Sequence, residues 1–164
     1  GDHDNVLSAF LPFAKKKRND FWVWDVLSEV FEGEEDKIIA CYSKALSCRI
    51  SDDFLINIRQ KMATILIGKQ LFNEAKTEII KLVKARSEKG WPIPSKVVEW
   101  QNQQWFQQAV GNENNFKFYR KHLAIGDDIL FSDIQEQKIF VNFVNLDRKM
   151  LNFIDETGNN GFFK

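Results

Sequence analysis

The sequence predicts a mainly α-helical fold of antiparallel helix pairs, followed by a short C-terminal antiparallel β segment. Three observations support this prediction. Between residues 5 and 124, apolar side chains recur every three to four positions, which is the spacing of one face of a helix. Glycines and prolines divide that region into short stretches. From Lys138 onward, β-favouring residues lie on both sides of a polar turn, which indicates a hairpin.

Each stretch that is expected to form a helix carries an apolar stripe. The stripe is clearest in the second stretch, where Trp24, Leu27 and Phe31 follow helical spacing and Gly33 marks the end. The prolines at 92 and 94 restrict the residues before them, so residues 91–94 are expected outside a helix. The predicted helices cover residues 5–17, 19–32, 35–48, 52–69, 72–88, 95–109 and 113–124.

The last part of the chain has the period of strands. Residues 139–144 and 150–154 are predicted to pair across a turn, and a second turn signal at 157–161 precedes the start of a third strand at Phe162. Two domains are expected: a helical-repeat domain over 1–126, and a linker with a partial β domain over 127–164. Because the third strand is short, we expect the chain to be part of a larger multidomain protein.

Residues 38–46 resemble the second helix of a tetratricopeptide repeat (TPR), with Tyr42 and Ala45 matching its aromatic and small positions. A second match begins at Phe72 and reaches Ala75, and Ile38 and Ala75 lie 37 residues apart, against a family period of about 34. Ile38 departs from the alanine that the family prefers. The resemblance covers roughly residues 19–90 and implies stacked helix pairs with a concave face for a protein or peptide. A generic helical bundle is the alternative.

The cations of the helix at 72–88 are the candidate partner-binding residues of such a face, although a solvated helix surface explains them equally. They are Lys76, Lys81, Lys84, Arg86 and Lys89. The run of four positive charges at 15–18 is interpreted as a solvated helix end, with a phosphate site as the alternative reading.

The C-terminal segment is similar to the first three strands of a cold-shock-type OB fold. The resemblance implies a face on which nucleic-acid bases stack. Met150 and Asn152 stand where that family has glycines, and their side chains obstruct the approach of a base. A hairpin that packs on the last helix is the alternative interpretation. The residues that the resemblance assigns to nucleic-acid binding are Phe143, Lys149, Phe153, Phe162 and Phe163.

Helical repeats followed by an OB-like segment are also similar to accessory proteins of bacterial conflict systems. The composition adds little to this resemblance. Lys plus Arg and Asp plus Glu number 23 each, so no global field attracts nucleic acid or an anionic membrane. No stretch approaches the roughly 18 apolar residues that span a bilayer. No membrane association is therefore expected.

Catalytic and metal-binding motifs are not found. Cys41 and Cys48 lie about 10 Å apart along one helix, too far for a disulfide, so free thiols and a cytoplasmic location are expected. His3 and His122 form no zinc spacing with them. Asp127 and its acidic neighbour are expected in a loop, where they are a weak cation signal. We expect no cofactor, no metal and no enzyme activity.

The function predicted from these patterns is a protein–protein interaction scaffold made of TPR-like helical repeats. The alternative is single-stranded nucleic-acid binding through the C-terminal OB-like unit. The first interpretation rests on the paired helices and on the missing catalytic motifs. The second rests on the aromatic residues of the β segment.

Overall fold

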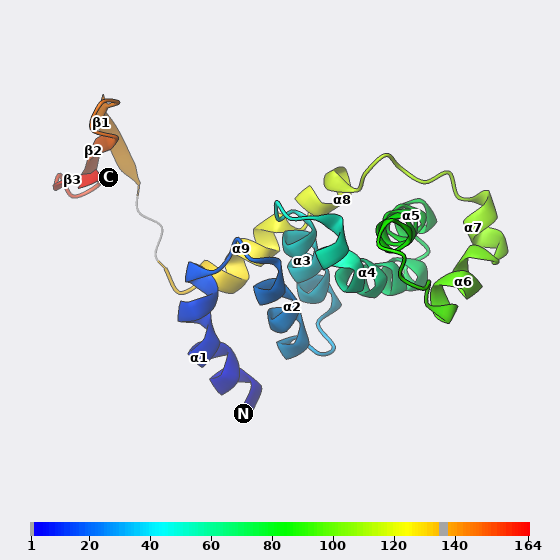
Figure 1. Cartoon of the computed structure of the whole chain (residues 1–164). Helices are drawn as coiled ribbons and strands as arrows, with labels where there is room; N and C mark the ends of the chain where they lie inside the picture. The colour runs from blue at the N-terminus through cyan, green and yellow to red at the C-terminus, as the bar shows by residue number, and fades with distance from the viewer. Residues whose placement is uncertain (1, 135–137) are drawn as a thin grey trace. The chain divides into compact units, whose positions relative to one another are not determined.

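The computed structural model describes residues 2–134 and 138–164, so Gly1 and residues 135–137 of the predicted linker lie outside the described residues. The predicted fold class is confirmed, because the chain is mainly helical and ends in a three-stranded antiparallel sheet (Figure 1). The chain divides into a helical unit, Gly1–Phe131, and a β unit, Ser132–Lys164. The helical unit therefore continues beyond residue 126, where the sequence analysis placed the boundary, because the last helix reaches Phe131.

The helices of the first half agree closely with the predicted ranges. Pro12 lies inside the first of them. The predicted helix over 52–69 begins with a turn of 3₁₀ helix before the α-helix follows. The bounds are α1 (Asp2–Lys16), α2 (Phe21–Val30), α3 (Glu35–Leu46), η1 (Asp52–Leu55), α4 (Ile56–Gly68) and α5 (Phe72–Glu88).

The helices after residue 90 differ from the prediction. The stretch 95–109 forms two helices, α6 (Ser95–Gln101) and α7 (Gln104–Gln108), with an extended backbone at Gln103 between them. In one continuous helix, Trp100 and Phe106 would project about 120° apart. The break allows both rings to enter the same core.

The predicted helix over 113–124 is also wrong in its bounds. The chain forms α8 (Phe116–Arg120) and then α9 (Leu123–Phe131), a helix that the sequence analysis placed in a loop. Gly126 misled that interpretation, because glycine in a short polar stretch indicates a turn. Here it is a packing residue, since an added Cβ would lie 2.7 Å from Cγ of Lys44.

Helix pairs organise the helical unit. Helix α2 packs on α3 and α4 packs on α5, while α9 returns to cover α3 and α1 (Figure 1). Small residues stand where these helices approach, since Ala40, Ala45, Ala63 and Ala75 are fully buried. One apolar core joins α1 to α4 with α8 and α9, and a second joins α4 to α7.

The segment between α7 and α8 runs along α5 and is fixed to it by hydrogen bonds. The backbone N–H of Val110 donates to Oδ1 of Asn73 at 3.0 Å, and that of Asn112 donates to Oγ1 of Thr77 at 2.7 Å. Nδ2 of Asn115 donates to the carbonyl oxygen of Glu74 at 2.9 Å. Part of the surface of α5 is therefore covered by this chain itself.

The β unit is a meander with strand order β1-β2-β3, formed by β1 (Ile139–Asn145), β2 (Met150–Asp155) and β3 (Asn160–Phe163). The predicted hairpin and third strand are confirmed. The first turn ends at Lys149, whose φ of 50° is left-handed. A bulge at Asn142 shifts the register, because Val141 pairs with Phe153 whereas Phe143 pairs with Asn152.

Candidate functional site

The predicted nucleic-acid residues lie on both faces of the sheet, because strand alternation separates Phe162 from Phe163 and the bulge in β1 places Phe143 beside Phe162. Residues that pair across strands share a face. Phe143 and Phe162 both pair with Asn152, so they lie on one face. Phe153 and Phe163 lie on the other, where their rings stack with centroids 4.9 Å apart. Lys149 is exposed in the turn.

The opposite placement of these rings has a consequence for base stacking. The OB resemblance implies one face that carries Phe143, Phe153 and either Phe162 or Phe163, but Phe143 and Phe153 lie on opposite faces of the sheet. Phe153 lies against Gly161, where an added Cβ would be 2.3 Å from Cζ of the ring. This glycine, which the sequence analysis treated as part of a turn, is where the ring packs against the backbone of β3.

Both faces of the sheet are apolar and exposed. No residue between 138 and 164 is buried. Phe140 is 70% exposed on the face that carries Phe143, and Val141 is 52% exposed on the other. A three-stranded sheet normally needs a covering layer on at least one face. The described residues of the β unit therefore form no buried core of their own.

The five cations predicted as a partner-binding face of α5 have separate environments. Nζ of Lys76 donates to the carbonyl oxygens of Phe106 and Ala109, at 2.7 and 2.8 Å, and so closes the end of α7. Lys84 pairs with Glu88 at 3.9 Å, and Arg86 donates to the carbonyl oxygen of Pro92 at 2.8 Å. Lys89 lies 3.2 Å from the carboxylate of Asp53. Lys81 is half-buried and lines a cavity.

A buried ion pair that sequence reasoning missed joins α4, α5 and α8. Glu78 is fully buried, and its carboxylate accepts from Arg59 at 2.7 Å, from Nδ2 of Asn115 at 2.7 Å and from the hydroxyl of Tyr119. Burial and the negative Glu78 raise the pKa of Tyr119, so the phenol stays protonated and donates. Burial alone would lower the pKa of Arg59, but the negative charge of Glu78 raises it. This network joins three helices and engages both oxygens of the Glu78 carboxylate.

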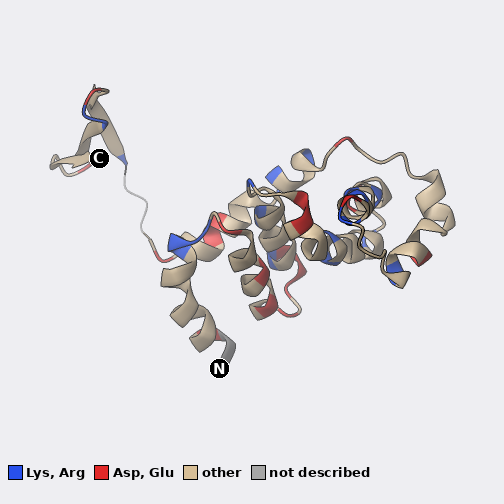
Figure 2. Ribbon diagram, viewed as in Figure 1, with Lys and Arg blue, Asp and Glu red and all other residues tan. Residues whose placement is uncertain are grey.

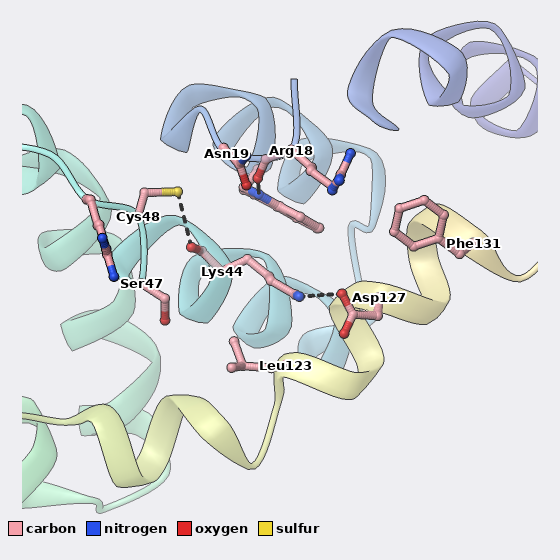
Figure 3. Close-up of a pocket in the computed structure, with 10 residues that line it drawn as sticks. Arg18, Asn19, Lys44, Ser47, Cys48, Leu123, Asp127 and Phe131 are labelled. Carbon is pink, nitrogen blue, oxygen red and sulfur yellow. Dashed lines mark hydrogen bonds and ion pairs between the residues drawn. The ribbon is translucent and has the colours of Figure 1, made fainter. Parts of the chain in front are cut away.

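A cavity of the helical unit, with a volume of about 610 Å³, lies between the α1–α2 turn, the end of α3 and helix α9 (Figure 3). This volume is in the range of small-molecule sites. Its walls combine basic and aromatic side chains. The lining residues are Arg18, Asn19, Trp24, Lys44, Ser47, Cys48, Arg49, Leu123, Asp127 and Phe131.

Lys44 is held in this cavity by contacts with Trp24 and Asp127. Its ammonium lies 5.6 Å from the ring centroid of buried Trp24 and pairs with the carboxylate of Asp127 (Figure 3). Its aliphatic stem crosses α9 at Gly126, where a larger residue would collide with it. Trp24 is held in turn by a 2.7 Å hydrogen bond from Nε1 to the carbonyl of Arg18. In the acidic pair that gave the weak cation signal, Asp127 is thus engaged with Lys44.

The two arginines of the cavity are not neutralised. The guanidinium of Arg18 lies 6.0 Å from the Phe131 ring centroid and donates to the carbonyl of Lys15. Arg49 is exposed and makes no hydrogen bond or ion pair with any residue that the structure describes. Figure 2 shows the positive charge of the α1–α2 turn, to which Arg18 belongs. In the sequence, only the run of four positive charges at 15–18 pointed to this cavity, through Arg18. Nothing in the sequence singled out Lys44 or Arg49.

The thiols and the histidine of the helical unit are not poised for chemistry. Burial raises the pKa of Cys41 to about 12, and burial with nearby Asp20 raises the pKa of Cys48. Burial lowers the pKa of His122. Among the described residues, no three His, Cys, Asp or Glu side chains cluster closely enough to hold a metal ion. None of the described helices is long and apolar enough to cross a membrane.

Comparison with known proteins places the helical part of the chain in a family. A family model described as a domain of unknown function, DUF7017, matches residues 1–124. The chain belongs to this family. The DUF7017 match ends at the start of α9 and leaves the β unit outside. No curated protein and no solved structure matches the chain.

Proposed function

We propose that the chain is a protein-binding scaffold, in which the DUF7017 helices form a TPR-like support and the β unit carries the contact surface. The observation that supports this most directly is the exposure of apolar side chains on both faces of the sheet. Contiguous apolar surface of this kind is typical of sites that bind another protein. The partner would supply the missing layer against β1, β2 and β3.

The TPR-like part of the proposal is supported by the arrangement of the helix pairs. Helices α2 and α3 form one pair, α4 and α5 form the next, and α3 packs on α4 between them. The buried alanines Ala45 and Ala75 occupy the small positions that the resemblance requires. Stacked pairs bury a continuous core and make a rigid platform.

The sheet also has features of a contact surface that recognises a protein rather than a small ligand. Its free edges are β1 and β3, because β2 lies between them. An unpaired edge can accept an additional strand, whose backbone groups then form hydrogen bonds while its side chains contact the apolar faces. We therefore propose an extended or β-forming segment of another protein as the partner.

The proposal is tested by comparing the proteins retained by the intact chain and by two variants, using quantitative affinity capture and mass spectrometry. The double variant Phe140→Ser and Phe143→Ser removes two rings from one face of the sheet. The matched control is Val110→Ser, which changes an apolar residue that is 84% exposed in the helical unit. We expect specific partners to be lost with the double variant and kept with the control. Identical sets for all three chains would contradict the proposal.

Single-stranded nucleic-acid binding remains the second candidate, supported by the stacked rings of Phe153 and Phe163 and by Lys149 of the turn, which lines one hollow together with Phe163. Two stacked rings on one face could accept a base. A gel shift with single-stranded oligonucleotides at low salt tests it. Binding that weakens with salt and with Phe163→Ala would favour this function, whereas no shift at low salt would exclude it.

A further inference from the structure

We propose that the 610 Å³ cavity of the helical unit binds a small phosphorylated molecule, held by the guanidinium groups of Arg18 and Arg49. This site is separate from the protein-contact surface of the β unit and does not depend on it. Three observations on the cavity support the proposal: its excess of positive charge, the unused hydrogen-bond donors of its arginines, and its shape.

The charge of the cavity contrasts with the charge of the chain. The chain carries equal numbers of cationic and anionic side chains, 23 of each. The cavity is lined by three cations, Arg18, Lys44 and Arg49, and by one carboxylate, Asp127. Since Lys44 and Asp127 pair with each other, the two arginines leave an excess of two positive charges. Low-dielectric walls such as Trp24 and Phe131 strengthen their field at the cavity mouth.

The donors of the two arginines point to phosphate as the anion. A guanidinium group offers five N–H donors in a planar fork that matches the oxygens of phosphate. Arg18 uses one of its terminal nitrogens on the carbonyl of Lys15. Arg49 uses none on a described residue. Binding of a phosphate by either guanidinium would therefore break no ion pair within the described part of the chain.

The shape of the cavity fits a molecule larger than phosphate alone. Apolar surface is supplied by Leu123, Phe131 and Trp24, which line the cavity together with the charged groups. The side chain of Lys44 lies across α9 and is held there by its pair with Asp127, so it lines the wall of the cavity and does not fill it. A ligand with a phosphate for the arginines and an organic part for the apolar wall satisfies both features.

A neighbouring cavity allows the site to be distinguished from its surroundings. That cavity, of about 400 Å³, shares Ser47, Cys48 and Arg49 with the first and is lined on its far side by Lys81. Arg18 lines only the first of the two, and Lys81 only the second. Substituting Arg18 and Lys81 separately therefore shows which of the two cavities binds the anion.

The test is isothermal titration calorimetry on the full chain with three probes: ADP, inorganic pyrophosphate and uncharged adenosine. We expect saturable binding of ADP or pyrophosphate at low salt, weakening as salt screens the arginines. Adenosine should bind much more weakly than ADP. Arg49→Gln and Arg18→Gln should each weaken binding about tenfold to a hundredfold, which is the loss expected for a hydrogen bond to a charged group.

The controls are Lys81→Gln, in the neighbouring cavity, and Arg120→Gln, an exposed cation that lines neither cavity. Both should bind as the unsubstituted chain does. Circular dichroism of each variant verifies that the helices are intact. Absence of binding by both ADP and pyrophosphate at low salt would overturn the proposal. So would binding that Lys81→Gln weakens and Arg18→Gln does not.

Discussion

The helical unit and the β unit use apolar residues in opposite ways. In the helical unit, large side chains such as Trp24, Leu27 and Leu82 are fully buried, and even the charged Glu78 is enclosed with its partners. In the β unit, the rings of Phe140 and Phe162 are more than half exposed. Both regions are rich in apolar residues, so composition does not explain the difference.

The difference lies in the number of layers. Paired helices cover one another, because each contributes one apolar stripe to a shared core. A single three-stranded sheet has two faces and no layer to cover either of them. The helical unit therefore contains its own stabilising contacts, whereas the apolar side chains of the described β unit stay exposed, which is the basis of the proposed contact surface. The following predictions test this contrast, from the largest effect to the smallest.

The largest effect is expected from Glu78→Gln in the buried network. The substitution keeps the shape of the side chain but removes the charge that faces Arg59 inside the protein. Arg59 keeps a second partner, the exposed carboxylate of Asp52 at 2.7 Å. Breaking a buried pair costs about 3–5 kcal/mol, so the free energy of unfolding should fall by about 3 kcal/mol, the lower end of that range. Urea denaturation followed by circular dichroism measures it. Glu99→Gln, which alters an exposed pair with Lys96, should change stability by less than about 1 kcal/mol. A similar small change for Glu78→Gln would contradict the assignment.

The second prediction compares the same kind of truncation in the two units. Leu82→Ala opens a cavity in the second helical core and should cost about 2–5 kcal/mol. Phe140→Ala removes a larger side chain that is mostly exposed, and should change the stability of the isolated chain by about 0.5 kcal/mol or less. Urea denaturation reports on the helices, and amide NMR signals of the strands report on the sheet. A cost for Phe140→Ala as large as that for Leu82→Ala would show that the ring is covered in solution.

The third prediction concerns the close approach of α3 and α9 at the cavity. In Gly126→Ala, the new methyl group would collide with the stem of Lys44. Overpacking costs about 1–3 kcal/mol, and the better helix propensity of alanine offsets up to about 1 of it. A net loss of about 1 kcal/mol in thermal or urea unfolding is expected. Gly68→Ala is the matched control, because its methyl group meets no atom within 4 Å and should be neutral or stabilising. Equal effects at the two glycines would mean that Lys44 does not cross α9 here.

The smallest effect is expected at the turn between β2 and β3. Hydrogen bonds from the side chain of Thr157 and the backbone of Asn159 lower the pKa of Asp155 from 3.8 to about 2. The group therefore stabilises the turn above pH 3.8, and that contribution is lost as pH falls through about 2. NMR titration should show the amides of Thr157 and Asn159 shifting with a midpoint near pH 2. A midpoint near 3.8 would show that these bonds do not form in solution.

Much of the architecture could be predicted because local patterns decide it. Helix α5 has the bounds that the sequence predicted, since its apolar spacing and the following Gly90 act locally. The hairpin of β1 and β2 follows from β-favouring residues around a polar turn. Errors occurred where a distant contact overrides the local signal. Gly126 lies within helix α9, where the stem of Lys44 occupies the space that a side chain at 126 would fill. No residue near position 126 in the sequence indicates this contact.

The candidate sites divide in the same way. The aromatic residues of the β unit were visible as a pattern, but the bulge at Asn142 decided which face Phe143 occupies, and the register of β2 and β3 decided the faces of the others. The charges of α5 were visible too, yet Lys76 closes the end of α7, a contact between residues 30 and 33 positions apart. Arg18, Lys44 and Arg49 gather around one cavity only because α1, α3 and α9 meet there.

By itself, the sequence determined the helix-rich class, the change to strands near residue 138 and the turns between most elements, because periodicity and turn residues act over a few positions. The tertiary structure decided which charges meet, which rings share a face and which glycine admits a neighbouring helix. Those outcomes depend on contacts between segments far apart in the chain. The energies of these contacts come from burial and hydrogen bonding, which exist only once the segments are packed together.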